Sequence, residues 1–335
     1  MTRILLLTTA LIASAATAQA EVTLSGDARM GVIKPFPALG SGESTSIEFT
    51  SRARVKVDMT SETDGGLSFG GSFRINEAGD AATGHAGEVF ISGEWGTLSM
   101  GDVDGAALSA IDHVSYVGLT DLESLNELRY IANGFEDTDP SVLYKYNRGE
   151  WTFYASVVNP GTVTETTVDT VDPNIGYVFT SAPGVHAYSV AARYETERFA
   201  VAFGYEKNHV DYSSYDAGSV VDQQNLMLGV EGKFNDLTLK AIVGHFEGSD
   251  VAFINDVSVL VPNISGTQYA VSADYVINDL TLTAFYADDS RYDGTKAYGV
   301  GAEYDLGGDA SVKGGYVKDK ADGASSFDLG ISMSF

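Results

Sequence analysis

Five basic side chains fall on one face of three consecutive predicted strands. They alternate with apolar residues, at Arg29, then at Arg52, Arg54 and Lys56, and then at Arg74. Antiparallel neighbours bring residues of the same face together, and counting back from a turn at residues 61–66 sets Arg54 approximately opposite Arg74. Like charges paired across a sheet destabilise it, so we expect acidic groups to face this cluster. The alternative is that all five side chains are simply solvated on a polar face.

An acidic stretch at residues 101–140 supplies the expected counter-charge. Its acidic residues are Asp102, Asp104, Asp112, Asp121, Glu123, Glu127, Glu136, Asp137 and Asp139. A long insertion between regular elements is usually functional or disordered, and the apolar residues within this one argue against disorder. We expect Asp121, Glu123 and Glu127, together with Asp112, to face the basic cluster. The chemistry would be an electrostatic filter for polar solutes, with no bond made or broken.

The same stretch is predicted to contain a short helix. Thr120 and Glu123 fit a capping box, and Asn133-Gly134 provides a C-terminal stop. Apolar residues recur at three-residue steps, at Leu122, Leu125, Leu128 and Ile131. Glu123 and Glu127 would then share one helix face, and the leucines would pack the other face against a wall.

Catalytic and metal chemistry find less support in the sequence. The five histidines are scattered, there is no G-x-S-x-G motif, and the absence of cysteine excludes thiolate chemistry and disulfides. Asp102 and Asp104 resemble the start of a calcium loop, but the glutamate required downstream is missing. We therefore expect no enzyme activity and no cofactor, and weak calcium binding at Asp102 and Asp104 is the alternative left open.

The elements that must position these residues are amphipathic strands. Polar and apolar residues alternate through most of the chain, with short links at one set of turns and longer loops at the other. Seven short and eight longer links join sixteen strands, an arrangement typical of a transmembrane β-barrel. Residues 174–180 could be a seventeenth strand, but an odd number would place the two ends of the chain on opposite sides. We therefore assign residues 159–185 to one long loop, and we also assign residues 248–266 to a loop.

The predicted N-terminal targeting signal and the net charge of the chain narrow the class of protein further. Residues 1–20 are predicted to be a signal peptide, with Arg3, an apolar stretch and the cleavage pattern Ala18-Gln19-Ala20. The chain has 20 basic and 46 acidic residues; without Arg3 the numbers are 19 and 46, a net charge of −27. Nucleic acid is excluded as a partner because its binding requires basic patches.

The two ends of the predicted barrel domain, residues 21–335, carry a family resemblance. The last strand alternates up to a terminal Phe335, and Trp95 and Trp151 flank short turns, as in an aromatic belt at a membrane surface. The start EVTLSGDARMGV at residues 21–32, the segment SRARV at residues 51–55 and GLTDL at residues 118–122 resemble general diffusion porins of alphaproteobacterial photosynthetic bacteria.

This resemblance implies an all-β, 16-stranded antiparallel transmembrane barrel whose third long loop, residues 101–140, folds into the lumen. It also implies a homotrimer in the outer-membrane lipid of a Gram-negative bacterium, assembled by barrel-assembly machinery that reads Phe335. The function we expect is passive diffusion of ions and small hydrophilic solutes, with a preference for cations. Two alternatives remain: a substrate-specific outer-membrane channel, and a secreted soluble β-sandwich that binds a ligand.

Overall fold

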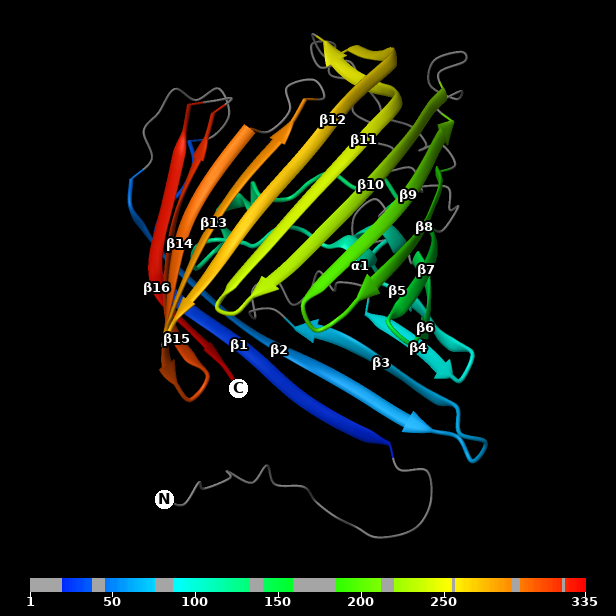
Figure 1. Cartoon of the computed structure of the whole chain (residues 1–335), viewed down its shortest axis with the longest axis horizontal. Helices are drawn as coiled ribbons and strands as arrows, with labels where there is room; N and C mark the ends of the chain where they lie inside the picture. The colour runs from blue at the N-terminus through cyan, green and yellow to red at the C-terminus, as the bar shows by residue number, and fades with distance from the viewer. Residues whose placement is uncertain are drawn as a thin grey trace, which may run out of the picture.

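The chain folds into a barrel in the computed structural model, which describes residues 20–37, 46–75, 87–132, 141–158, 185–211, 220–254, 257–290, 296–320 and 323–335. Across these residues sixteen strands pair antiparallel with their sequence neighbours, and β1 pairs with β16 to close the sheet (Figure 1). The predicted strand number is therefore confirmed. Residues 1–20 were predicted to be a signal peptide, and residues 1–19 lie outside the described part of the chain.

The strands have the following bounds. They are β1 (Glu21–Lys34), β2 (Glu48–Glu62), β3 (Ser68–Ile75), β4 (Glu88–Gly93), β5 (Gly96–Gly101), β6 (Ser141–Arg148), β7 (Trp151–Val158), β8 (Val185–Glu195), β9 (Phe199–Asp211), β10 (Val220–Phe234), β11 (Leu237–Ile254), β12 (Val257–Ile277), β13 (Leu280–Asp289), β14 (Lys296–Gly307), β15 (Ala310–Asp319) and β16 (Ser325–Ser334). Between β5 and β6 lie a short helix, α1 (Ala106–Ile111), and a 3-10 turn, η1 (Asp121–Ser124). Among the described residues, no helix has the length and hydrophobicity needed to cross a membrane.

Backbone pairing at Phe335 completes the closure of the barrel. The N–H of Phe335 donates to the carbonyl of Gly26 at 3.0 Å, and the N–H of Gly26 donates to the carbonyl of Phe335 at 2.6 Å. The Phe335 ring lies over Gly26, where any added Cβ would collide with it. A closed sheet leaves no unpaired strand edge, which is the condition for placing strands in lipid.

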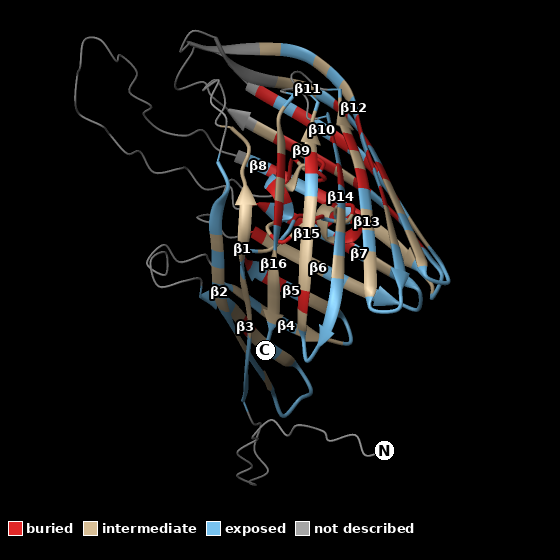
Figure 2. Ribbon diagram, turned by 90° about the vertical axis from the view of Figure 1, so that its left-hand side faces the viewer, coloured by how far each residue is buried: buried red, intermediate tan, exposed pale blue. Residues whose placement is uncertain are grey.

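The two faces of the wall differ in the way the sequence alternation predicts. Along β9, Ala200, Ala202 and Glu206 point inward and are buried, whereas Val201 and Phe203 point outward and are exposed. Figure 2 shows this alternation of buried and exposed positions along the strands. The buried core lies inside the barrel, where the segment between β5 and β6 packs on the inner wall. The outer surface is left apolar and without a protein partner in the described structure, as a lipid-facing wall requires.

Aromatic side chains border this apolar surface at the short-turn end. The exposed rings there include Trp95, Trp151, Phe153, Phe199, Phe234, Tyr275 and Tyr304. The Trp95 ring stacks on Tyr144 with centroids 6.2 Å apart, and Trp151 lies 5.1 Å from Tyr194. Amphipathic rings at this level match the aromatic belt of a membrane protein.

The prediction of a loop at residues 248–266 is wrong. The two strands continue as a paired hairpin, with β11 ending at Ile254 and β12 beginning at Val257. Gly248, with φ of +155°, and Asn263, with φ of +59°, lie where the register shifts, so they mark a β-bulge and not the ends of strands. The predicted loop at residues 159–185, with its alternative strand at residues 174–180, falls on residues that the structure leaves undescribed up to residue 184.

Candidate functional site

The segment between β5 and β6, called here loop three and comprising residues 101–140, enters the barrel through α1. The backbone N–H groups of Ala106 and Ala107 donate to Ser156 Oγ on β7 and Ser189 Oγ on β8, at 2.8 and 2.9 Å. Gly204 on β9 lets the helix approach closely, because a Cβ there would collide with Ala107. The N–H groups of Ala106 and Ala107 in the first helical turn are thus satisfied by hydroxyl groups of the inner wall.

The middle of loop three reaches the opposite wall, at β16 and β1. Asp328 on β16 accepts hydrogen bonds from the backbone N–H and the hydroxyl of Thr120, both at 2.7 Å. Arg29 on β1 donates from Nη1 to the carbonyl of Leu119 at 3.2 Å. Gly118, with φ of +88°, lies so close to Asp328 that a side chain could not fit there. Loop three therefore spans the lumen from β5 to the seam between β16 and β1.

The loop then returns along the wall formed by β9, β10 and β12. The backbone N–H groups of Ile131 and Ala132 donate to the fully buried carboxylate of Glu206 on β9, at 3.1 and 3.3 Å. Gln268 on β12 accepts from the N–H of Arg129 and donates to its carbonyl, both at 2.9 Å. Glu206 and Gln268 therefore fix the path of loop three along this wall. The backbone N–H groups of the loop in turn satisfy the buried carboxylate of Glu206, which needs such donors.

The predicted helix over residues 120–131 is wrong. Asp121, Leu122, Glu123 and Ser124 all have positive φ values, and Thr120 makes no capping hydrogen bond. Its hydroxyl donates to Asp328 instead, a long-range partner that outweighs the local capping pattern. Leu122, Leu128 and Ile131 are nevertheless buried, so the prediction that they anchor the loop is confirmed, although Glu123 and Glu127 do not share a helix face.

The basic cluster lies on the inner face of β1, β2 and β3 with a register different from the predicted one. Arg29 is directly opposite Arg52, and Arg74 is opposite Lys56, not Arg54. The difference of two residues arises at the turn, where the N–H of Thr63 donates to the carbonyl of Leu67, so that β2 extends to Glu62.

Asp27 separates the like charges of the basic cluster and was not among the predicted site residues. Its carboxylate accepts from Arg52 Nη2 at 3.1 Å and from Arg54 Nε at 2.8 Å. Lys56 pairs with Asp58 at 2.9 Å. Asp27 and Asp58 stand on the polar faces of strands already predicted, so the alternation itself was the signal that could have found them.

Of the four predicted acidic residues, Asp121 lies where loop three is attached beside Arg29, two residues after Leu119. Desolvation raises the pKa of the Asp121 carboxyl, and the positive charges of Arg29 and Arg52 oppose that rise. Glu123 is exposed in the same turn. Loop three therefore brings one carboxylate directly into the field of two arginines at the seam of the barrel.

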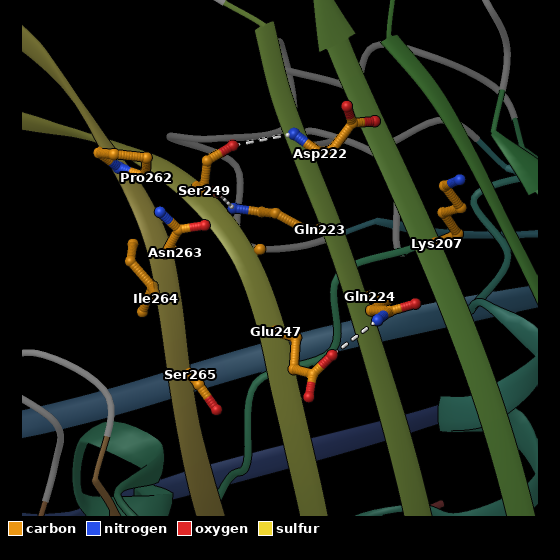
Figure 3. A pocket seen from close by; sticks show the side chains of 11 residues that line it. Lys207, Asp222, Gln223, Gln224, Glu247, Ser249, Pro262, Asn263, Ile264 and Ser265 are labelled. Carbon is orange, nitrogen blue, oxygen red and sulfur yellow. Dashed lines mark hydrogen bonds between the residues drawn. The ribbon is translucent and has the colours of Figure 1, made fainter.

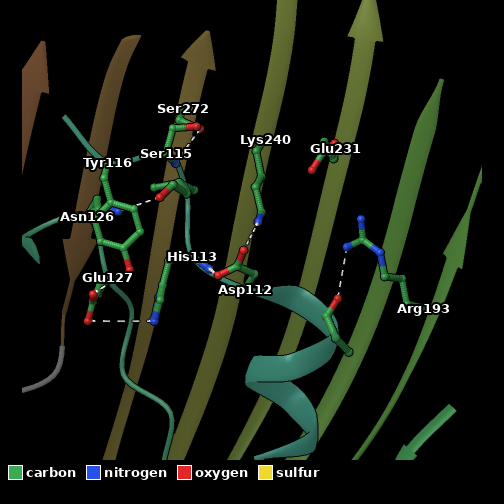
Figure 4. Close-up of polar contacts among 12 residues, drawn as sticks. Asp112, His113, Ser115, Tyr116, Asn126, Glu127, Arg193, Glu231, Lys240 and Ser272 are labelled. Carbon is green, nitrogen blue, oxygen red and sulfur yellow. Dashed lines mark hydrogen bonds and ion pairs between the residues drawn. The ribbon is translucent and has the colours of Figure 1, made fainter. Parts of the chain in front are cut away.

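Asp112 and Glu127 belong to a second group, on the side of loop three that faces β11 (Figure 4). Lys240 Nζ on β11 lies 3.9 Å from Asp112 Oδ2, and the Tyr116 hydroxyl donates to Glu127 Oε1 at 2.7 Å. His113 Nε2 is 4.0 Å from Glu127 Oε2. Burial lowers the pKa of the His113 imidazole, while Glu127 and Asp112 oppose that shift. Sequence patterns did not single out His113 or Lys240.

The calcium candidates carry no arranged ligand set. Asp102 and Asp104 are exposed, and desolvation, followed by the charge of Asp102, raises the pKa of the Asp104 carboxyl. Within the described ranges, no group of three or more metal-ligating side chains is placed to hold an ion. Calcium binding at Asp102 and Asp104 stays a prediction.

The closed barrel, its apolar outer wall and the loop spanning its lumen define a channel across an outer membrane. The chain belongs to the Gram-negative porin family, whose model matches residues 7–324. Porins of this family are channels for diffusion in the outer membrane and not enzymes.

Individual relatives agree with this assignment. The chain is 32% identical to the porin of Rhodobacter capsulatus, over 94% of this chain and all of that protein, and 26% identical to the porin of Fuscovulum blasticum, over 88% and 93%. It also resembles a solved porin structure refined at 1.8 Å resolution, with a TM-score of 0.74, 29% identity and coverage of 94% of this chain and all of that one. A variant of Rh. blastica porin shares the fold, with a TM-score of 0.67, 23% identity and the same coverage.

Proposed function

We propose that this porin prefers cations, and that the preference is set where Asp121 and Glu123 face the basic cluster of β1 to β3. The observation that carries the proposal is the contact of Arg29 with the carbonyl of Leu119, two residues before Asp121, because Arg29 lies directly opposite Arg52 and both charges act on the Asp121 carboxylate. Opposed charges at close range produce a field across the channel. Polar solutes and hydrated ions can align in such a field, whereas apolar solutes must displace ordered water.

The sign of the preference follows from the fixed charge that an ion meets along its path. The chain carries a net charge of −27 without Arg3, and low-dielectric walls focus this field into the lumen. Part of the basic cluster is neutralised locally, because Asp27 pairs with Arg52 and Arg54. Asp112, Glu127, Asp121 and Glu123 all remain exposed on loop three. The cation preference should weaken with rising salt as the Debye length shrinks.

Assembly and targeting form the second part of the proposal. We propose that the protein is a homotrimer, that residues 1–20 are removed on export, and that the barrel-assembly machinery reads the strand ending at Phe335. Supporting the last point, β16 is the strand that closes the barrel, and its terminal residue pairs with Gly26. A cross-linked monomer or dimer in native membranes would contradict the trimer.

The test is the zero-current potential of purified protein in planar bilayers under a potassium chloride gradient. The wild type should give the sign of a cation-preferring channel. The triple variant Asp121→Asn, Glu123→Gln and Glu127→Gln should shift the potential toward anions. Asp279→Asn is the matched control, because it removes one exposed carboxylate in the short turn between β12 and β13. An anion-preferring wild type, or equal shifts per charge in the triple variant and the control, would contradict the proposal.

Flux measurements separate this proposal from the substrate-specific alternative. Sugars and amino acids of increasing size should enter reconstituted vesicles at rates proportional to their concentration. A flux that saturates for one solute and is blocked by its analogue would favour a specific channel instead.

A further inference from the structure

Two histidines lie directly opposite one another on the outer face of the barrel wall, at the end of the strands opposite the short turns. His186 on β8 pairs with His209 on β9, and their ring centroids are 6.3 Å apart. Both side chains point outward, because their neighbours Ala187 and Asn208 face inward and are buried. The pair therefore lies outside the lumen, away from loop three and the basic cluster.

A carboxylate on the next strand orients one of the two rings. Asp222 on β10 is directly opposite His209, and its Oδ1 lies 2.7 Å from His209 Nδ1. Figure 3 shows the Asp222 side chain pointing from β10 toward β9, while its backbone N–H donates to Ser249 Oγ at 3.1 Å. Because a carboxylate can only accept, Nδ1 of a neutral His209 carries the proton and Nε2 keeps its lone pair. A carboxylate that fixes the tautomer in this way is the usual second partner of a metal-binding histidine.

The spacing of the two rings suits a shared ion. Residues directly opposite on one face of an antiparallel pair have Cβ atoms about 4.5–5.5 Å apart. With metal–nitrogen bonds of about 2.0–2.1 Å, two imidazole rings that share one tetrahedral ion have centroids roughly 5 Å apart. The observed pair needs only a small rotation of each side chain to reach this distance. Among the described residues, the His186 ring contacts the His209 ring and makes no hydrogen bond or ion pair, so it is free to turn.

The donor set selects the kind of ion. Imidazole nitrogen binds Zn²⁺ and Cu²⁺, whereas Mg²⁺ and Ca²⁺ require oxygen ligands. Lys207, two residues before His209 on the same face, disfavours a cation, and the Asp222 carboxylate on the other side of His209 offsets it. The net charge of −27 without Arg3 also raises the concentration of cations at the protein surface.

We propose that His186 and His209 bind one divalent transition-metal ion, Zn²⁺ or Cu²⁺, through one imidazole nitrogen each. Water fills the remaining coordination positions, so the site differs from a structural zinc site, in which the protein supplies four ligands. Asp222 is a positioning residue that acts through His209. The bound ion links the outer faces of β8 and β9 at the rim of the barrel, and its binding is independent of the cation preference of the lumen.

The test is isothermal titration calorimetry of chelator-treated protein in detergent with zinc chloride. A large excess of Mg²⁺ in the buffer occupies carboxylate sites that bind any divalent ion. The ligand variants are His186→Gln and His209→Gln. His245→Gln is the matched control, because His245 is also an exposed outward histidine, with Nε2 3.3 Å from Glu247 Oε1, but neither of its cross-strand partners is a histidine.

The wild type should bind one Zn²⁺ per chain, and each ligand variant should bind it about tenfold or more weakly. His245→Gln should bind like the wild type, and zinc should leave the single-channel conductance of all these proteins unchanged. Electron paramagnetic resonance of bound Cu²⁺ should show coupling to two imidazole nitrogens in the wild type and to one in each ligand variant. Asp222→Ala should lower the affinity about tenfold while keeping the two-nitrogen signal, which separates a positioning residue from a ligand.

Three results overturn the proposal. The first is a wild type that binds no Zn²⁺ in excess Mg²⁺, and the second is an equal loss of affinity in His245→Gln and the ligand variants. The third is a one-nitrogen Cu²⁺ signal in the wild type, which would show that His209 binds the ion without His186. The Cu²⁺ spectrum of the wild type decides the matter even if a variant fails to fold.

Discussion

Asp328 on β16 holds Thr120 of loop three by two hydrogen bonds, both 2.7 Å long, from its backbone N–H and its hydroxyl. The other oxygen of the same carboxylate accepts from the N–H of Gly315 at 3.1 Å. Asp328 is only 3% exposed, so a charged group has been buried to fasten the middle of the loop to the barrel seam. The position of Asp121, one residue further on, depends on this attachment.

Asp328→Asn should loosen loop three. The amide oxygen is a weaker acceptor than a carboxylate oxygen, and the amide nitrogen cannot accept the hydrogen bond that the second carboxylate oxygen accepted. We expect the free energy of unfolding to fall by about 1–3 kcal/mol. Single-channel recordings should show larger current fluctuations. Glu303→Gln is the control, since it changes a half-buried carboxylate that pairs with Lys313 on the inner wall. Current fluctuations no larger than those of the wild type, together with unchanged thermal stability of Asp328→Asn, would contradict the role of Asp328 in fastening loop three.

Asp27→Asn should both destabilise the barrel wall and shift the ion selectivity. Arg29 and Arg52 stand directly opposite each other, and Asp27 is the carboxylate paired with both Arg52 and Arg54. Without its charge, we expect a loss of about 1–3 kcal/mol and a zero-current potential moved toward anions. Asp58→Asn, which releases only Lys56, serves as the comparison. The prediction is wrong if both variants move the potential equally.

Selectivity should depend on pH in the acidic range. Desolvation raises the pKa of Asp121 above the ordinary 3.8, and burial lowers the pKa of His113 below the ordinary 6.5. Asp121 therefore becomes neutral at a pH above 3.8 as the solution is acidified, and His113 becomes positive beside Glu127 only at a pH below 6.5. Both changes reduce the negative charge on loop three, so cation preference should fall in this window. Combining Asp121→Asn with His113→Gln should flatten the zero-current potential between about pH 6.5 and pH 4. An unaltered pH curve would exclude these two groups as its source.

Phe335 should matter for assembly more than for export. Its backbone closes the sheet against Gly26, and its ring is 70% exposed on the outside. Phe335→Asp places a charge on the lipid face, so we expect less protein in the outer membrane and an accumulation in the periplasm. Cell fractionation and immunoblotting measure both, with Ser334→Ala as control. Normal outer-membrane levels of Phe335→Asp would contradict the prediction.

The sequence predicts the barrel because alternation, turn spacing and a terminal aromatic residue are local and repeated signals. It predicts the conformation of loop three less well because that conformation depends on wall residues distant in sequence. Thr120 fits a capping box, yet Asp328, which is 208 residues away in sequence, is the partner that its hydroxyl takes. Glu206 and Gln268 fix the return path in the same way. The composition of the basic cluster is visible in the sequence, but its register depends on the turn after Glu62.

The most direct test of the central claim is a double-mutant cycle between Asp121 and Arg52, measured as zero-current potential in a salt gradient. Asp121→Asn should move the potential toward anions, and Arg52→Gln should move it toward cations. Because the two charges act on one another across the channel, the double variant should differ from the sum of the single effects, most strongly at low salt. Two single shifts of the same sign, or strict additivity at every salt concentration, would contradict a transverse field between Asp121 and the basic cluster.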